Sequence, residues 1–249
     1  MRVTKYNASG NDFIIFHDTK KQDRSILATS LCNRHMGVGA DGMVVLVPHE
    51  KFDFEWEFYN ADGSSATMCG NASRAVAHYA CQKGISVDNQ AEFLTGAGVI
   101  RAKVNGDYVL SDMVPPKIIN REIVEDSETW WLIDTGVPHL VALRDNIDLF
   151  DIQKARTLRE KYNANVNIAM LGENGRLNVR TYERGVEDET LACGTGMVAS
   201  FVRAFHEGRV GPKVQVVPKS NEDIDVQISE EIYQLGGRVK KVFVAELSE

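Results

Sequence analysis

Apolar residues along the chain follow two spacings, and each spacing predicts a different element. Short apolar runs bounded by turn residues predict strands, and apolar residues three and four positions apart predict helices. The two most apolar helical stretches each follow a cysteine–glycine pair, at Cys69–Gly70 and at Cys193–Gly194. The first of these helices is expected to end near Lys83. The sequence thus predicts two similar helix N-termini, one in each half of the chain.

The other elements are shorter or more polar. Two further helices are expected over Ser25–Arg34 and Asp148–Tyr162. A polar turn is expected over residues 7–12, and Asn105–Gly106 is a hairpin signal. Strands are predicted over Met1–Tyr6, Phe13–His17, Met43–Val47, Phe52–Tyr59, Gln90–Leu94, Val99–Val104, Tyr108–Ser111, Thr129–Asp134, His139–Ala142, Asn165–Leu171, Leu177–Glu183, Val214–Val217, Asp223–Ile228, Ile232–Leu235 and Val239–Ala245.

The order of these elements repeats between the two halves of the chain. Each half has strands, one amphipathic helix, more strands, the apolar cysteine-headed helix and strands again. Many short strands joined by hairpin signals favour a mainly antiparallel or mixed sheet, which would wrap around the apolar helix. We therefore predict an α/β (α+β) fold of two domains, 1–115 and 116–236, with a boundary at Pro115–Pro116.

Composition and charge narrow the class of protein. The chain has 249 residues, 43% of them hydrophobic and 25% charged, as is ordinary for a globular protein. Its net charge of −7 argues against nonspecific binding to nucleic acid. No apolar run approaches the roughly 18 residues that a membrane span requires. The N-terminal residues lack the apolar core of a signal peptide, so a cytoplasmic location is expected.

The four cysteines fall into two classes. None of their spacings forms a C-x-x-C pair, which argues against a structural zinc site. Cys32 and Cys81 lie inside apolar helical patterns and are expected to be packing residues. Cys69 and Cys193 instead lie at helix N-termini, where N–H groups and the helix dipole favour an anion and make a thiol reactive.

A glycine-rich segment, Gly37–Gly42, matches G-x-G-x-x-G letter for letter. A dinucleotide fingerprint follows a strand and opens a helix. This segment instead follows a helix and precedes a strand, so we interpret it as a glycine-rich loop.

Two thiols presented by two similar helix N-termini suit inversion at a stereocentre. One thiolate can remove a proton from one face of a carbon while the other thiol delivers a proton to the opposite face. Negative charge would build on a carboxylate beside that carbon, and helix N–H groups would stabilise it. Gly70 and Gly194 would permit close approach of the backbone. No electron-sink cofactor is required by such a site.

A set of motifs, taken in order, resembles the diaminopimelate epimerase family over essentially the whole chain. The motifs are Ser9–Phe13, Arg34–His35 with Gly37–Gly39, Asn60–Gly63, Met68–Asn71, Pro138–His139, Asn165–Asn167, Tyr182–Gly185 and Ala192–Gly196. The resemblance implies two pseudo-symmetric domains, each a sheet around a central helix, with the active site in the cleft between them. It also implies that the last strand, about 237–249, crosses back to the first domain.

The resemblance further implies a reaction and its residues. The reaction would interconvert LL- and meso-2,6-diaminopimelate without cofactor or metal, in lysine and peptidoglycan-precursor biosynthesis, and the enzyme would be a homodimer. Cys69 and Cys193 would be the acid/base pair, with His139 and Glu183 tuning their protonation. The reacting carboxylate would bind N–H groups of Gly70, Asn71, Gly194 and Thr195. The other end of the substrate would contact Asn11, Asn60, Asn167, Glu183 and Arg184.

Some of these residues have simpler interpretations, and the chain departs from the family pattern at a few positions. Without the resemblance, Asn11 and Asn60 would be turn formers, His139 a strand-end histidine, and Glu183–Arg184 a solvated strand end. The family often has glutamine at Gly42 and asparagine at Val137, and its usual Asn-Gly-Ala-Arg reads Asn-Ala-Ser-Arg at residues 71–74 here. The Arg184–Cys193 segment is one residue longer. These departures do not affect the two thiols, but they reduce the number of substrate contacts that we expect.

Two alternative functions stay open. A proline or hydroxyproline racemase of the same fold would also use paired cysteines, but its cyclic substrate needs an apolar slot. A thiol redox or binding protein could instead join Cys69 and Cys193 in a disulfide.

Overall fold

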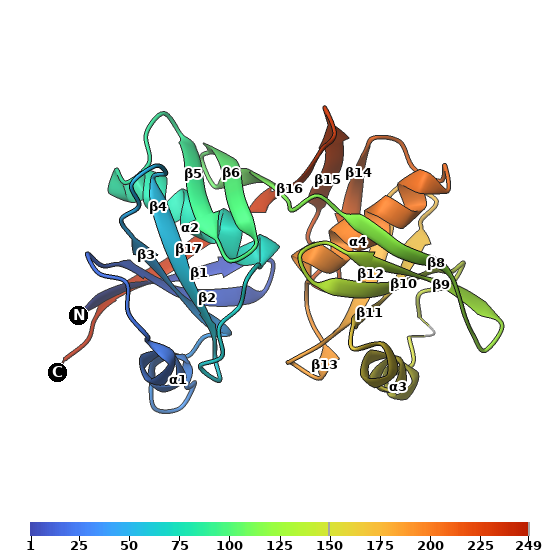
Figure 1. Cartoon of the computed structure of the whole chain (residues 1–249), viewed down its shortest axis with the longest axis horizontal. Coiled ribbons are helices and arrows are strands. Elements are labelled where there is room, and N and C mark those ends of the chain that lie inside the picture. The colour runs from blue at the N-terminus through green and yellow to red at the C-terminus, as the bar shows by residue number, and fades with distance from the viewer. Residues whose placement is uncertain (149, 249) are drawn as a thin grey trace. The chain divides into compact units, whose positions relative to one another are not determined.

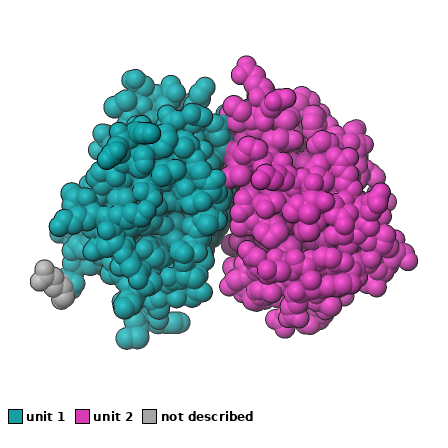
Figure 2. All heavy atoms as spheres, in the orientation of Figure 1, with its two compact units in different colours: residues 1–112, 237–249 teal, residues 113–236 magenta. Residues whose placement is uncertain are grey.

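The computed structural model describes residues 1–148 and 150–248, which form four helices and 17 strands. The chain divides into two compact units, Met1–Asp112 with Gly237–Glu249, and Met113–Gly236. Figure 2 colours them separately. The mixed α/β fold predicted from the sequence is confirmed.

The first unit is a mixed sheet packed against two helices, α1 and α2 (Figure 1). Strands β17, β1 and β2 pair antiparallel, β2–β3 and β4–β5 are parallel, and β3–β4 and β5–β6–β7 are antiparallel. Helix α2 packs against β1, β2, β3, β5, β6 and β7. The bounds are β1 (Arg2–Ala8), β2 (Asn11–His17), α1 (Ser25–Cys32), β3 (Gly42–Val47), β4 (Phe54–Asn60), α2 (Gly70–Lys83), β5 (Gln90–Thr95), β6 (Gly98–Asn105), β7 (Tyr108–Asp112) and β17 (Lys240–Glu246).

The second unit repeats this plan. Strands β8, β9 and β10 pair antiparallel, β10–β11 and β12–β14 are parallel, and β11–β12–β13 and β14–β15–β16 are antiparallel. Helix α4 packs against β9, β10, β11, β12, β14 and β15. The bounds are β8 (Lys117–Glu125), β9 (Glu128–Asp134), β10 (Pro138–Leu143), α3 (Ile152–Tyr162), β11 (Asn165–Leu171), β12 (Leu177–Glu183), β13 (Asp188–Glu189), α4 (Gly194–His206), β14 (Lys213–Val217), β15 (Ile224–Ser229) and β16 (Ile232–Arg238).

Helices α2 and α4 are buried on all sides over their first eleven residues. Helices buried on every side need such enclosure, and the surrounding strands supply it. Helix α2 ends at Lys83 and is capped by Gly84, whose backbone adopts φ 68, and the N–H of Ile85 donates to the Ala80 carbonyl. That left-handed glycine cap fixes where the helix stops.

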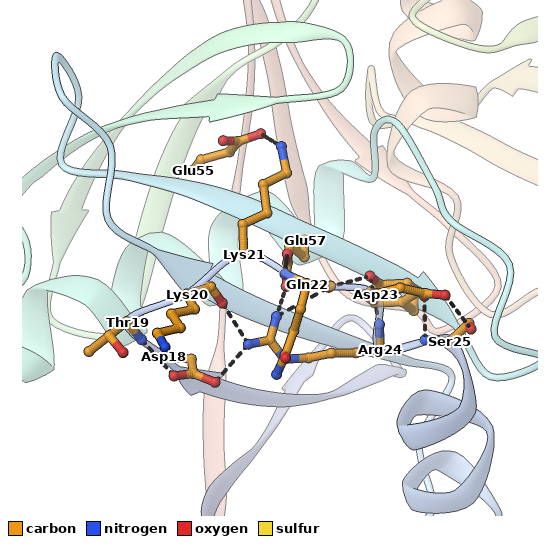
Figure 3. Close-up of polar contacts among 11 residues, drawn as sticks. Asp18, Thr19, Lys20, Lys21, Gln22, Asp23, Arg24, Ser25, Glu55 and Glu57 are labelled. Atoms are coloured by element: carbon orange, nitrogen blue, oxygen red, sulfur yellow. Dashed lines mark hydrogen bonds and ion pairs between the residues drawn. The ribbon is translucent and has the colours of Figure 1, made fainter.

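The segment before α1 is held to β4 by a buried arginine (Figure 3). The Arg24 side chain is 2% exposed and forms an ion pair with the Glu57 carboxylate. Its other terminal nitrogen, Nη2, donates to Asp18 Oδ2 at 2.7 Å and to the Lys20 carbonyl at 2.8 Å. A buried guanidinium is tolerated when its donors are satisfied in this way, so Arg24 fixes the entry of the chain into α1.

Several sequence-based bounds need correction. The turn expected over residues 7–12 is only the pair Ser9–Gly10, both at positive φ, so Asn11 opens β2 and pairs with Ala8. Helix α3 begins at Ile152 rather than Asp148, because the Asp151 side chain caps the N–H groups of Gln153 and Lys154. Part of the predicted stretch, Leu149, lies outside the described residues, as does Glu249 of the predicted terminal strand.

Two strands were absent from the sequence-based prediction. Strand β8 is largely exposed along its length, so its residues show no apolar alternation, and it forms a hairpin with β9. Strand β13 has only two residues and pairs with the end of β12. Strands of this kind are defined by a partner and not by burial of one face.

The two cysteines expected to pack differ in burial. Cys32 is 2% exposed in the core beside α1, as predicted. Cys81 is only half-buried, so it is less buried than its predicted packing role requires. Across residues 1–148 and 150–248 no helix has the length and apolar character to span a bilayer. Within the same residues no cluster of three or more His, Cys, Asp or Glu side chains suits a metal ion.

Candidate functional site

Cys69 is the N-cap residue of α2. Its backbone is extended, and its sulfur accepts a hydrogen bond from the Ala72 N–H at 3.5 Å. The Ser73 N–H bonds the Cys69 carbonyl at 2.9 Å, which closes the first helical turn. The sulfur therefore lies at the positive end of the helix dipole, where negative charge on sulfur or on a bound anion is stabilised.

Beside Cys69, two asparagines and an arginine form a hydrogen-bonded row. The Cys69 thiol lies 3.8 Å from Asn11 Oδ1, which also accepts from Asn71 Nδ2 at 3.4 Å. Arg74 donates to Asn71 Oδ1 at 2.6 Å and is fully buried. The structure thus brings together Asn11, Cys69, Gly70 and Asn71, all of which the sequence analysis placed in the site.

An ion cluster borders this row. Asp41 accepts from Asn11 Nδ2 at 2.8 Å and from Arg34 at 2.7 Å. Arg34 also pairs with Asp12 at 2.8 Å, and Lys5 contacts the same carboxylate at 2.7 Å. Burial alone would raise the pKa of Asp12, but the hydrogen bonds from Arg34 and Lys5 outweigh it and lower that pKa to about 2. These charges hold the start of β2 against the loop before β3.

Asn60 lies at the end of β4, opposite Gly42 of β3. Its side-chain amide donates to Ser64 Oγ at 3.0 Å, so in this structure it braces its own turn. A Cβ at Gly42 would lie 2.8 Å from the Phe58 ring and 2.9 Å from the Tyr59 carbonyl. The space that a glutamine would need is therefore filled by an aromatic ring, which gives a physical reason for glycine at this position.

Cys193 is the N-cap residue of α4 and is 6% exposed. Its sulfur lies 3.5 Å from the Thr195 hydroxyl, and its carbonyl accepts from the Met197 N–H at 2.9 Å. The Thr135 hydroxyl donates to the Thr195 carbonyl at 3.2 Å and ties this turn to the loop after β9. Cys193 thus holds the same N-cap position as Cys69, although its side chain makes no capping hydrogen bond to the helix.

Behind this helix N-terminus lies a fully buried neutral network. Thr181 donates to Asn167 Oδ1 at 2.8 Å, so the Asn167 amide nitrogen faces His139 Nδ1 at 3.0 Å. A Cβ at Gly196 would lie 2.3 Å from Asn167 Oδ1, so only glycine lets α4 start this close to β11. Burial lowers the pKa of His139 to about 3, and its imidazole is therefore neutral at physiological pH.

Glu183 is the last residue of β12, and Arg184 follows it directly. The Arg184 N–H donates to Asn165 Oδ1 at 2.8 Å, and its guanidinium donates to the Asn163 carbonyl at 3.0 Å. Glu183 pairs with Asp188 of β13 in the sheet. The Arg184 side chain therefore braces the C-terminus of α3 in this structure.

The predicted site residues thus form two groups, one in each unit. Asn11, Asn60, Cys69, Gly70 and Asn71 belong to the first, and His139, Asn167, Glu183, Arg184, Cys193, Gly194 and Thr195 belong to the second. His139 and Asn167 bond each other, and Asn167 is fully buried. Direct contact of Asn167 with substrate stays a prediction.

Sequence reasoning missed three residues that hold these groups in place. Asp41 appeared only as part of a glycine-rich loop, Arg74 as part of a helix, and Thr181 as part of a strand. A charged residue within the apolar spacing of Ala72, Ala75 and Val76 was the available signal for Arg74. No local signal marks Asp41 or Thr181, because their partners lie on other elements.

Comparisons with known proteins agree on one family. The family model described as diaminopimelate epimerase matches residues 3–119 and 131–241. A diaminopimelate epimerase from a Nitratiruptor species is 57% identical over 98% of this chain and 97% of its own. One from Campylobacter jejuni (strain 81-176) is 52% identical, covering 98% of both chains. One from Helicobacter pylori is 40% identical over 98% of this chain and 95% of its own.

Solved structures share the fold at low sequence identity. A probable proline racemase from Agrobacterium radiobacter K84 has a TM-score of 0.80 at 15% identity, covering 99% of this chain and 92% of its own. A phenazine biosynthesis protein of the PhzF family from Enterococcus faecalis has a TM-score of 0.79 at 12% identity, covering 100% and 99%. These likenesses show the fold alone.

Proposed function

Because the chain belongs to the diaminopimelate epimerase family, we propose that it inverts one α-carbon of 2,6-diaminopimelate and interconverts the LL and meso forms. The protein is accordingly an isomerase. The observation that carries the mechanism is that Cys69 and Cys193 are each the N-cap of a buried helix. We assign the two units to the two halves of the enzyme, 1–115 with about 237–249, and 116–236.

In the proposed mechanism the two cysteines act on opposite faces of one α-carbon. A thiolate takes the α-proton and becomes a thiol, leaving the electron pair of the broken C–H bond on the carbon. The other thiol then gives its proton to the opposite face and becomes a thiolate. The two sulfurs have exchanged roles, so the same site runs the reaction in reverse.

Stabilisation of the carbanion is the larger demand, because an α-proton of an amino acid is far less acidic than a thiol. Charge delocalises onto the adjacent carboxylate, and we assign its binding to the N–H groups of Gly70, Asn71, Gly194 and Thr195. The first N–H groups of a helix have no intrahelical acceptor and lie at the positive end of its dipole. Donors fixed in place before the reaction stabilise the developing charge as an oxyanion hole does.

The non-reacting end of the substrate carries a second ammonium and a second carboxylate. We assign its binding to Asn11, Asn60, Asn167, Glu183 and Arg184. A guanidinium can hold a carboxylate through two parallel hydrogen bonds, so Arg184 would leave Asn163 when substrate binds. Glu183 would then accept from the ammonium.

His139 and Glu183 complete the proposed catalytic set by tuning the protonation of the thiols. The His139 ring is buried and neutral, with Nδ1 accepting from Asn167. A neutral ring adds no fixed charge to the α4 N-terminus, so Cys193 can alternate between thiol and thiolate without a permanent counter-ion. His139 thus acts through the hydrogen-bond network and not as a proton carrier.

We further propose that the enzyme uses no cofactor, works in the cytoplasm as a homodimer and serves lysine and peptidoglycan-precursor synthesis. These assignments follow from the family. Sedimentation velocity at micromolar protein checks the dimer, and a single species at the monomer mass would contradict it.

The function is tested by an assay with LL- and meso-diaminopimelate in the absence of pyridoxal phosphate. Conversion in both directions is expected, and alkylation of the thiols should abolish it. L-proline serves as the control substrate and should stay unchanged. Racemisation of proline without turnover of diaminopimelate would replace the proposed function with the alternative of the same fold.

A further inference from the structure

Four polar side chains beside Cys69 form a hydrogen-bonded row with a donor at one end and an acceptor at the other. It runs from Arg74 through Asn71 and Asn11 to Asp41, with contacts of 2.6, 3.4 and 2.8 Å. A guanidinium can only donate hydrogen bonds, and an ionised carboxylate can only accept them. Each asparagine between them can do both, so the ends decide which way the two amides face.

The Arg74 end fixes Asn71. The guanidinium donates to Asn71 Oδ1 and, within the same buried pocket, to Ser9 Oγ at 3.2 Å and the Gly70 carbonyl at 3.4 Å. Because Asn71 Oδ1 must face this donor, its amide nitrogen faces Asn11. Asn71 is 1% exposed, so the orientation is set by protein groups.

The Asp41 end fixes Asn11 in the same sense. Asp41 Oδ2 accepts both from Asn11 Nδ2 and from the Asp12 N–H at 3.0 Å, while Arg34 holds Oδ1. The Asn11 carbonyl oxygen is left facing Cys69. The contacts of this oxygen with the Asn71 amide and the Cys69 thiol are long, 3.4 and 3.8 Å, so it keeps capacity for a stronger donor.

We propose that Asp41 and Arg74 are positioning residues that hold Asn11 as a hydrogen-bond acceptor beside Cys69, so that Asn11 binds an ammonium group of the substrate. This proposal deepens and rests on the proposed function. Neither residue touches the reacting atoms. They act by fixing the orientation of the Asn71 and Asn11 side-chain amides. In both amides the oxygen faces the Arg74 end of the row and the nitrogen faces the Asp41 end.

The orientation matters because the proposed substrate has ammonium and carboxylate groups at both ends. A carbonyl oxygen attracts an ammonium and repels a carboxylate, whereas an amide N–H does the reverse. An asparagine free to rotate would accept either group and would tolerate a substrate bound the wrong way round. Discrimination of this kind comes as much from the repulsive contact as from the attractive one.

The test exchanges the two polar groups at the Asn11–Asp41 contact. In Asp41→Asn, residue 41 can donate or accept, so Asn11 loses its fixed direction. In the double variant Asn11→Asp, Asp41→Asn, residue 11 carries only acceptors and residue 41 can donate to it. The double variant has the net charge of the wild type and again presents an oxygen to Cys69.

Kinetics with diaminopimelate give the readout. Asp41→Asn is expected to lower kcat/KM about tenfold, mainly through KM, as loss of a charged hydrogen bond does. The double variant is expected to recover most of that loss. Asp53→Asn is the matched control, because it removes one carboxylate that caps a backbone N–H of the same unit at 2.9 Å. It should keep the wild-type kinetics.

The outcomes separate the two proposals. A wild-type protein that does not turn over diaminopimelate overturns the proposed function, whatever the variants do. An active wild type whose Asp41→Asn variant behaves like Asp53→Asn overturns the positioning role. A double variant no better than Asp41→Asn alone contradicts the acceptor role of residue 11, and it also overturns the proposal. Arg74→Lys, which keeps a donor-only end, should lose less kcat/KM than Arg74→Gln.

Discussion

The N-termini of α2 and α4 present the same residue types in different electrostatic surroundings. Each has a cysteine as N-cap followed by glycine, but the fifth residue after the cysteine is buried Arg74 in one helix and Val198 in the other. Beside Cys69 lie Asn11 and Asn71, which bond the charged side chains of Asp41 and Arg74. Around Cys193 lie a hydroxyl and a neutral imidazole network.

The difference shows that a cysteine at a helix N-terminus can be supported by its surroundings in two ways. At α2, fixed charges orient the amides that face the site, and part of the cluster is open to solvent. At α4, close packing of uncharged groups does the orienting, with Gly196 against Asn167 as the tightest point. Orientation by charged groups should be disturbed by a substitution that removes or reverses a charge. Orientation by packing should be disturbed by a substitution that changes side-chain volume.

The largest expected effect is on catalysis and treats the two helices alike. Cys69→Ala and Cys193→Ala should each lower the rate of epimerisation by about 10³-fold or more, because each removes one of the two proton carriers. Circular dichroism should show both variants folded. Substantial epimerase activity in either variant would show that one thiol suffices.

The second prediction separates charge at the α2 N-terminus from burial of an arginine as such. Arg74→Met and Arg203→Met each remove a buried guanidinium that bonds backbone carbonyls, near the start of α2 and in the last turn of α4. Both should cost about 2–3 kcal/mol of unfolding free energy, because acceptors are left without donors. Only Arg74→Met should also lower kcat/KM, by about 100-fold, since it removes the anchor of Asn71.

Urea titrations at 25 °C and steady-state kinetics at a temperature where both variants are folded make this comparison. Equal losses of kcat/KM in the two variants would mean that the effect of Arg74 is purely structural.

The smallest expected effect concerns pH and the neutral network at α4. The pKa of His139 falls from 6.5 to about 3 on burial, so below pH 6.5 the unfolded chain binds a proton that the folded chain does not. Its contribution to folding stability therefore falls as pH drops, by about 1.4 kcal/mol per pH unit between those values. His139→Gln should remove this part of the acid sensitivity.

Urea unfolding at pH 7, 6 and 5 checks the slope, with the exposed His35→Gln as control. An unchanged pH dependence in His139→Gln would show that the buried imidazole is not the group that titrates.

The sequence was sufficient to predict the helices and strands whose hydrophobic pattern is determined by neighbouring residues. Both cysteine-headed helices and most strands lie where apolar spacing predicts them, since burial of one stripe or face imposes that spacing. Strand β8 was missed because its residues are exposed along nearly the whole strand. The start of α3 was placed too early, since the capping role of Asp151 was overlooked.

The supporting residues of the site were less predictable than the thiols. Cys69 and Cys193 stood out because a helix N-terminus gives a thiol a known chemistry. Asp41 reaches Asn11 from 30 positions away in the chain, and Thr181 reaches Asn167 from the neighbouring strand. Such contacts depend on strand register, which no single stretch of sequence encodes.

The central claim is that two thiols serve opposite faces of one carbon, and isotope incorporation tests it most directly. LL-diaminopimelate is incubated with the wild-type enzyme in D₂O, and both isomers are analysed by mass spectrometry at low conversion. We predict that the meso product carries one deuteron at the inverted carbon while the remaining LL substrate carries almost none, because the donor thiol exchanges with solvent. Product that retains the original proton, as a single shuttling base would give, would contradict the account.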